Sequence, residues 1–244
     1  MLTPGCKSLL RCAPEESTMS ELQQLLHLGA SPVAISFRTS VPEGISHVAQ
    51  REPAGCGYWR RAAAGEVFYT EADDHKRCPV GAHTHNVQLS PEEAKELQGL
   101  VETMVGLEYL KPTDVAQIPT RKEPFAFAVY APLDQAPASP DVVLVRGNAR
   151  QLMLLAEAAQ SAGVSGSTPT MGRPTCAVLP EAIQAQKTSS SFGCIGNRVY
   201  TAIDDNEAYF AIPGTALQAV EERLRVIIKA NQALEQFHRE RARG

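Results

Sequence analysis

The chain has 244 residues, of which 43% are hydrophobic and 20% are charged, and its net charge at pH 7 is −4. This length suits one large domain or two closely packed halves. Nucleic-acid binding needs a concentrated basic surface, and no Lys/Arg cluster stands out in the central part of the chain, which argues against it. No apolar run approaches the roughly 20 residues that span a bilayer, so we expect no membrane association and a cytoplasmic location.

Helical and strand-like patterns alternate along most of the chain. Residues 1–18 are predicted to form a flexible N-terminal extension. Helices are predicted at residues 20–28, 58–64, 91–106, 149–162, 180–186 and from about 215 onward. Strands are predicted at residues 32–37, 66–70, 125–133, 141–146, 199–203 and 208–212. This mixture predicts an α/β or α+β fold in which helices flank a mixed sheet.

The helix at residues 91–106 has the clearest local signals. Ser90 suits the N-cap, and Pro91 suits the first helical position, where its missing N–H is not needed. Glu93 completes a capping box, because its side chain can reach back to the Ser90 amide. We therefore expect this helix to begin at Pro91.

Two segments of the chain repeat one pattern around a pair of cysteines. Cys56 and Cys78 bound the first segment, and Cys176 and Cys194 bound the second. In each, a small residue precedes the first cysteine, a helical run follows, and a glycine comes two or three residues after the second cysteine. This pattern predicts an internal duplication with pseudo-twofold symmetry, in which both halves pack as one compact unit. The predicted halves are residues 19–118 and 119–244.

The four repeated cysteines are candidate ligands of one shared metal centre. The thiolate is the form that binds metals, and nearby cations or helix N-termini lower the pKa of a cysteine. Arg60, Arg77 and Arg198 lie near these cysteines in sequence. We expect all four to hold an iron–sulfur cluster, most simply 4Fe–4S, for electron transfer or cofactor-linked redox chemistry. Whether the chain is also an enzyme stays open.

The four cysteines also suit three roles that need no iron. No CxxC spacing occurs, although that spacing is the strong local signal for iron–sulfur and zinc sites. The four thiolates could hold a structural zinc ion, or each repeated pair could form a thiol–disulfide redox centre. They could also be inert buried thiols. Cys6 and Cys12 lie in the predicted extension and carry no argument.

Polar residues around the last cysteine form a candidate ligand site. Ser191, Gly193, Gly196 and Arg198 offer a hydroxyl, backbone amides and a guanidinium, which together suit a small anion. A small-anion-binding module without catalysis is therefore another alternative, and a plain polar turn is the simplest interpretation. We expect either such a ligand or a redox partner protein, and homodimerisation stays open.

Two histidines follow the second cysteine in the sequence CPVGAHTH. His83 and His85 could provide a metal ligand or a proton-transfer group. If this segment is a strand, alternation of side chains puts both histidines on one face. Two histidines in a polar loop are otherwise simply solvated.

Three blocks of the sequence resemble an uncharacterised prokaryotic family known as domain of unknown function 169. The resemblance covers roughly residues 20 to 235, and it includes the four repeated cysteines. Because the family has no settled activity, the resemblance implies membership and little chemistry. The blocks are PVAISF, CGYWRRAAAGEVFYTEADDHKRCPVGAH and RPTCAVLPEAIQAQKTSSSFGCIGNRVYTAIDDNEAYFAIPG.

Overall fold

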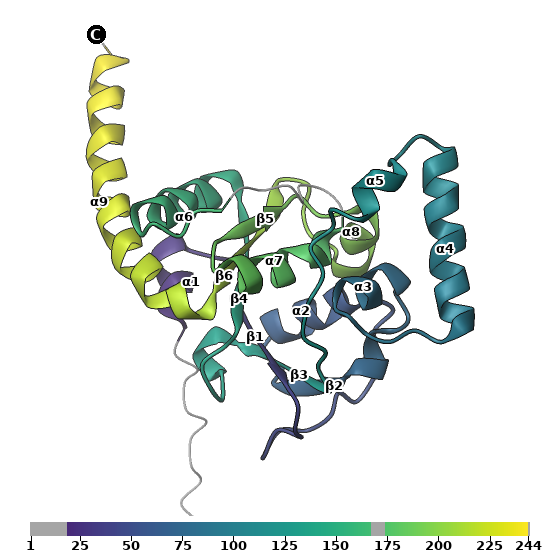
Figure 1. Ribbon diagram of the computed structural model, residues 1–244. Helices are drawn as coiled ribbons and strands as arrows, with labels where there is room; N and C mark the ends of the chain where they lie inside the picture. The colour runs from purple at the N-terminus through teal and green to yellow at the C-terminus, as the bar shows by residue number, and fades with distance from the viewer. Residues whose placement is uncertain (1–18, 167–173, 244) are drawn as a thin grey trace, which may run out of the picture.

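The computed structural model describes residues 19–166 and 174–243, which form one six-stranded sheet with helices packed on both of its faces (Figure 1). The predicted extension, residues 1–18, lies outside the described residues together with its two cysteines. The α/β fold class with flanking helices is confirmed.

The strands are short and are separated by helices or loops along the chain. They are β1 Val33–Arg38, β2 Phe68–Glu71, β3 Phe127–Pro132, β4 Val142–Asn148, β5 Ser189–Ser191 and β6 Glu207–Pro213. The α-helices are α1 Glu21–Leu26, α2 Gly55–Ala63, α3 Pro79–Thr84, α4 Pro91–Gly106, α5 Pro112–Val115, α6 Ala149–Ser161, α7 Val178–Ala185, α8 Ile195–Thr201 and α9 Leu217–Arg241. Four short 3₁₀ turns are η1 Ala72–His75, η2 Leu133–Gln135, η3 Thr175–Ala177 and η4 Gly214–Ala216.

The sheet has the strand order β2-β3-β1-β4-β6-β5. Each pair of neighbouring strands is antiparallel, so the prediction of a mixed sheet is corrected for these six strands. The order is symmetric about the central β1–β4 pair, with β3 matching β6 and β2 matching β5. A duplicated unit would produce this order, although the duplication and its boundary at residues 118 and 119 stay predictions. If β1, β2 and β3 form one group and β4, β5 and β6 the other, the chain passes from the first group to the second after residue 132. Strand β3 falls in the first group because it pairs with β1 and β2.

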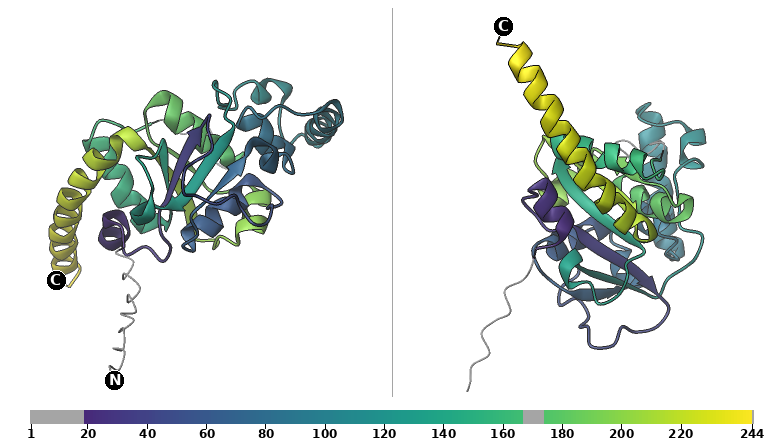
Figure 2. Two further views of the ribbon diagram at one scale, coloured as in Figure 1. Left: turned by 90° about the horizontal axis from the view of Figure 1, so that it is seen from below. Right: turned by 90° about the vertical axis from the view of Figure 1, so that its left-hand side faces the viewer.

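Side chains of the central strands alternate between two apolar layers. Val142 and Leu144 point into a layer that also holds residues of α2, α3 and α7. Val143 and Val145 point to the opposite side, where α1, α6 and α9 cover the sheet. Figure 2 shows α9 running along this second side and extending past the body at its C-terminal end. The four candidate cysteines are associated with the first layer and its helices.

Several predicted elements occur where the sequence placed them, and one does not. The helix at Pro91–Gly106 is confirmed, with the predicted capping box between Ser90 and Glu93. The strand predicted at residues 199–203 is wrong, because residues 195–201 form helix α8. Its β-branched residues favoured a strand, but Cys194 caps the helix and Thr201 donates a hydrogen bond to the Asn197 carbonyl.

Within the part of the chain that the structure describes, no helix combines the length and apolar character needed to cross a bilayer.

Gly214 allows the chain to turn from β6 close against the residues before β4. Its amide donates to the Asp141 carbonyl at 2.9 Å, and a Cβ atom at this position would overlap the carbonyl oxygen of Pro140. We expect Gly214→Ala to lower the free energy of unfolding by about 3 kcal/mol, because the two backbones must separate. Urea denaturation followed by circular dichroism measures this change.

The matched control is Gly99→Ala, in the exposed part of α4. No atom lies within 4 Å of a Cβ placed there, and alanine favours helix, so stability should stay constant or rise by up to about 1 kcal/mol. Equal stability of Gly214→Ala and the wild-type chain would contradict the tight contact.

Candidate functional site

Each of the four candidate cysteines lies at the start of a helix. Cys56 is in the first turn of α2, and Cys78 is the N-cap of α3. Cys176 lies in η3, which leads directly into α7, and Cys194 is the N-cap of α8. All four are free thiols. Helix starts carry unpaired backbone N–H groups, so this placement puts the cysteines close to backbone hydrogen-bond donors.

The helix starts meet across the two predicted halves. Helix α2 packs against α8, and α3 packs against η3. Cys56 is therefore brought towards Cys194, and Cys78 towards Cys176. Each of the four thiols lies close enough to the other three for their charges to interact. The structure thus brings together all four cysteines that the sequence singled out.

Among the described residues, no three Cys, His, Asp or Glu side chains lie close enough together to hold a single ion. The four sulfurs are therefore neighbours without forming a compact mononuclear site.

Burial keeps Cys56, Cys78 and Cys176 protonated at neutral pH. Desolvation raises the pKa of Cys56 to about 12, and the neighbouring Cys194 and Cys78 sulfurs add to the rise. Burial also raises the pKa of Cys78 and of Cys176, although part of each residue remains exposed. Ionising several of these thiols together would place like charges side by side.

Backbone and side-chain donors point at the sulfur atoms. The Asn197 amide N–H donates to Cys194 Sγ at 3.5 Å. The amides of Gly81 and Val80 partly offset the effect of burial on the pKa of Cys78. Such donors favour the charged form of a thiol, and they would equally favour sulfur bound to a metal.

The side chain of Asn197 is a site residue that the sequence patterns did not single out. It is only 2% exposed and lies beside the Cys56 sulfur and the Tyr209 hydroxyl, and its side chain lowers the pKa of both groups by hydrogen bonding, although neither Nδ2 nor Oδ1 reaches them with close hydrogen-bond geometry. A buried polar group without a close partner usually faces a water, an ion or a ligand. The only sequence signal for Asn197 is its position in the GCIGNR block, three residues after Cys194.

The loop that leads to Cys56 is fixed by a buried carboxylate. Asp74 accepts hydrogen bonds from His47 Nε2 at 2.7 Å, from Arg51 Nε at 2.6 Å and from the Glu71 amide at 2.8 Å. Burial raises the pKa of Asp74, but these hydrogen bonds outweigh that effect and lower it overall. The segment before α2 is therefore tied to η1.

The two histidines after Cys78 do not share a face, so that expectation is corrected. The segment is helix α3, with His83 exposed and His85 buried at the C-cap. His85 lies near a second buried histidine, His75, with ring centroids 6.0 Å apart. Burial lowers the pKa of His75 to about 4 and that of His85 to about 3. Both are therefore neutral core residues at pH 7.

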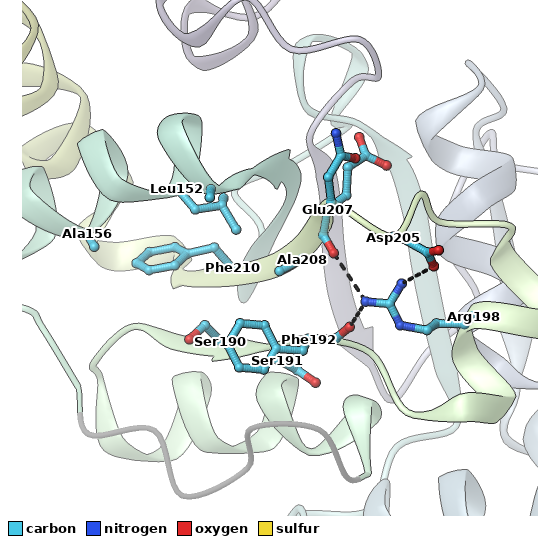
Figure 3. A pocket seen from close by; sticks show the side chains of 12 residues that line it. Leu152, Ala156, Ser190, Ser191, Phe192, Arg198, Asp205, Glu207, Ala208 and Phe210 are labelled. Atoms are coloured by element: carbon cyan, nitrogen blue, oxygen red, sulfur yellow. Dashed lines mark hydrogen bonds and ion pairs between the residues drawn. The ribbon is translucent and has the colours of Figure 1, made fainter.

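Two of the four predicted anion-binding residues line a cavity of about 500 Å³ beside β5 (Figure 3). Ser191 and Arg198 line the cavity, whereas Gly193 and Gly196 are not among its lining residues. The Arg198 guanidinium donates to the Phe192 carbonyl at 2.5 Å and lies 3.6 Å from the Asp205 carboxylate. These contacts occupy the guanidinium with partners from this chain. Anion binding by these four residues stays a prediction.

The comparison with known families identifies one match. Residues 21–223 match the model of a family described as uncharacterised ArCR, domain of unknown function 169. This stretch contains all four candidate cysteines and Asn197. No curated protein and no solved structure matches the chain.

The buried histidines predict a loss of stability in mild acid. Their pKa values are lower in the folded chain than the unperturbed value near 6.5, so the unfolded chain binds more protons as pH falls below about 6.5. We expect the free energy of unfolding to fall by about 2 kcal/mol for each histidine between pH 7 and pH 5. Urea denaturation at a series of pH values measures this dependence.

His85→Phe should remove about half of this pH dependence, because one titrating group is lost and the phenyl ring can pack against Phe37. His238→Phe is the control, since His238 is exposed on α9 and its replacement should leave the slope unchanged. Identical pH slopes in all three proteins would contradict the prediction.

Proposed function

The chain belongs to the domain of unknown function 169 family, and we propose that it is a redox protein in which Cys56, Cys78, Cys176 and Cys194 hold one 4Fe–4S cluster. The observation that carries the proposal is the convergence of four thiols from four helix starts, each interacting with the other three. A bound cluster would supply one-electron transfer.

A 4Fe–4S cluster needs its four cysteine sulfurs farther apart than a zinc ion does. Zinc binds sulfur at about 2.3 Å, so the four sulfurs of a zinc site must nearly touch. In a 4Fe–4S cluster each cysteine binds a different iron atom, and the ligands stand farther apart. The four thiols interact electrostatically, but they form no site for a single metal ion among the described residues. This arrangement agrees better with a cluster than with a zinc ion.

The raised pKa values support a metal centre over free reactive thiols. A thiol–disulfide enzyme needs an attacking thiolate, which requires a pKa near or below neutral. Burial keeps Cys56, Cys78 and Cys176 protonated instead. Positively charged iron would replace those protons and remove the repulsion between neighbouring thiolates, so cluster binding should release protons.

The buried amide of Asn197 beside Cys56 fits a cluster at this position. Bridging sulfides and ligating sulfurs accept hydrogen bonds, and the number of such bonds tunes the reduction potential. The Asn197 side chain is buried next to Cys56 and lowers the pKa of that thiol, and the Asn197 backbone N–H donates to Cys194. One residue could thus donate to the cluster region from both its backbone and its side chain.

The proposal predicts that the purified protein contains iron and sulfide. After anaerobic purification or reconstitution, we expect about four iron and four sulfide per chain and broad visible absorbance. Cys56→Ser, Cys78→Ser, Cys176→Ser and Cys194→Ser should each lose most of the cluster. Iron and sulfide analysis, together with the ultraviolet–visible spectrum, measures the loss.

The control for these variants is the double variant Cys6→Ser and Cys12→Ser, which should retain a full cluster. One zinc per chain without visible absorbance would favour the zinc-binding alternative. A colourless protein without metal after reconstitution would reject the proposal.

Replacing Asn197 tests whether its side chain faces the cluster. Asn197→Leu has a similar volume and removes both polar atoms of the side chain. We expect it to retain iron but to lower the midpoint potential by tens of millivolts, because a hydrogen bond to sulfur stabilises the reduced, more negative cluster. Redox titration followed by electron paramagnetic resonance measures the shift.

Asn206→Leu, at an exposed asparagine in the turn before β6, is the matched control and should not change the potential. Asn197→Leu could instead raise the stability of the iron-free chain and leave the midpoint potential of the cluster unchanged. That result would show that the Asn197 side chain makes no hydrogen bond to the cluster.

A further inference from the structure

Helix α9 carries two stripes of apolar residues, and the inner one is covered by the rest of the chain. Val220 and Leu224 are fully buried in the layer that α1 and α6 also form. Farther along the same side, Asn231 donates a hydrogen bond to Glu157 of α6 at 2.7 Å. A helix on a protein surface normally has one apolar stripe, which faces the core. The inner stripe of α9 fills that role.

The second stripe lies on the outer side of α9. Its six positions are three, four, three, four and three residues apart, which is the repeat of a coiled coil. All six are exposed, and Val226 and Phe237 are 56% and 54% exposed. We call this set the outer α9 stripe, and its members are Arg223, Val226, Ala230, Ala233, Phe237 and Glu240.

The outer α9 stripe follows the part of the helix that extends past the body of the protein. Figure 2 shows the C-terminal part of α9 standing clear of the sheet. The stretch that matches the family model ends at residue 223, so nearly all of the stripe lies beyond it. Most helix stability in proteins comes from packing of an apolar face, because helices without such packing are marginal in water. A partner along the stripe would supply that packing.

The stripe is complementary in size to a second copy that runs in the opposite direction. In a symmetric antiparallel pair of helices, each residue faces the one at the same distance on the other side of the twofold axis. With the axis at the middle of the stripe, Ala230 faces Ala233 and Val226 faces Phe237. The central alanines let the two backbones approach closely, and each phenyl ring packs against a valine farther out. Small and large side chains are therefore matched along the contact.

The two ends of the stripe carry opposite charges that meet in the same pairing. Arg223 faces Glu240 of the second copy, and the symmetry repeats this pair at the other end. Within the described part of the chain neither residue has an ion pair, and Glu240 accepts a hydrogen bond from the exposed Gln236. A parallel pair would place arginine beside arginine and glutamate beside glutamate. The charges therefore select an antiparallel second copy as the occupant.

We propose that the outer α9 stripe pairs with the same stripe of a second copy, forming a symmetric antiparallel homodimer. At 1.5 Å per residue, the contact from Arg223 to Glu240 is about 25 Å long. Six residues per helix are fewer than the roughly 20 to 30 per side of a standard interface, so association should be reversible and in the micromolar range. The pairing does not depend on the proposed cluster, because α9 covers the side of the sheet opposite to the cysteines.

Sedimentation velocity of the full chain over a series of concentrations tests the pairing. We expect the wild-type protein to shift from monomer to dimer across the micromolar range. In the double variant Val226→Ser and Phe237→Ser, the dissociation constant should rise at least about tenfold, because each dimer loses two valine–phenylalanine contacts. Gln232→Ser, at an exposed position of α9 outside the stripe, is the matched control and should leave the constant unchanged. Circular dichroism checks that each variant is folded.

Exchanging the charges at the ends tests the antiparallel register. Arg223→Glu alone and Glu240→Arg alone should each raise the dissociation constant about fivefold at low salt, because like charges then meet at both ends. An equimolar mixture of these two variants should associate as strongly as the wild-type protein, because the mixed dimer again has opposite charges at both ends. A chain that carries both substitutions should also regain wild-type association.

Three results would overturn this proposal. A wild-type chain that stays monomeric at high micromolar concentration would show that no second copy occupies the stripe. A dissociation constant that does not change in the double serine variant would place the dimer contact elsewhere. A mixture of the two charge variants that associates no better than either variant alone would exclude the antiparallel register. None of these measurements depends on iron, so they are independent of the outcome for the cluster.

Discussion

The candidate site depends on one constraint: the starts of several helices pack against each other above one face of the sheet. Helix α2 contacts α8, and α3 contacts η3. Because each helix begins at or beside a cysteine, these two contacts are enough to bring four thiols from distant parts of the chain into one region. The central strands β1 and β4 support both contacts from below.

Burial on this face keeps three titratable side chains in the layer of the thiols neutral. It raises the pKa of Cys56 and lowers the pKa of His75 and His85, so all three are neutral at pH 7. Asp74 is the charged exception, and hydrogen bonds from three donors hold its carboxylate. A metal centre here would introduce positive charge into a neutral, sulfur-lined region, where it would interact strongly with its ligands.

Helix α8 connects the buried region with the solvent. Its polar side carries Asn197 next to the thiols, and its apolar side carries Ile195 and Val199 at the surface. The same rotation of the helix therefore accounts for both the buried amide and the exposed apolar side chains.

The sequence by itself determined the fold class, the clearest helix and the four cysteines. These depend on local signals: alternating patterns, the capping box at Ser90, and repeated spacing of cysteines and glycines. Only the tertiary structure decided that residues 195–201 are helical, that His83 and His85 lie on different faces, and that Asn197 lies beside Cys56. Those outcomes follow from contacts between segments far apart in the chain. Local propensity, which favoured a strand after Arg198, carries no information about such contacts.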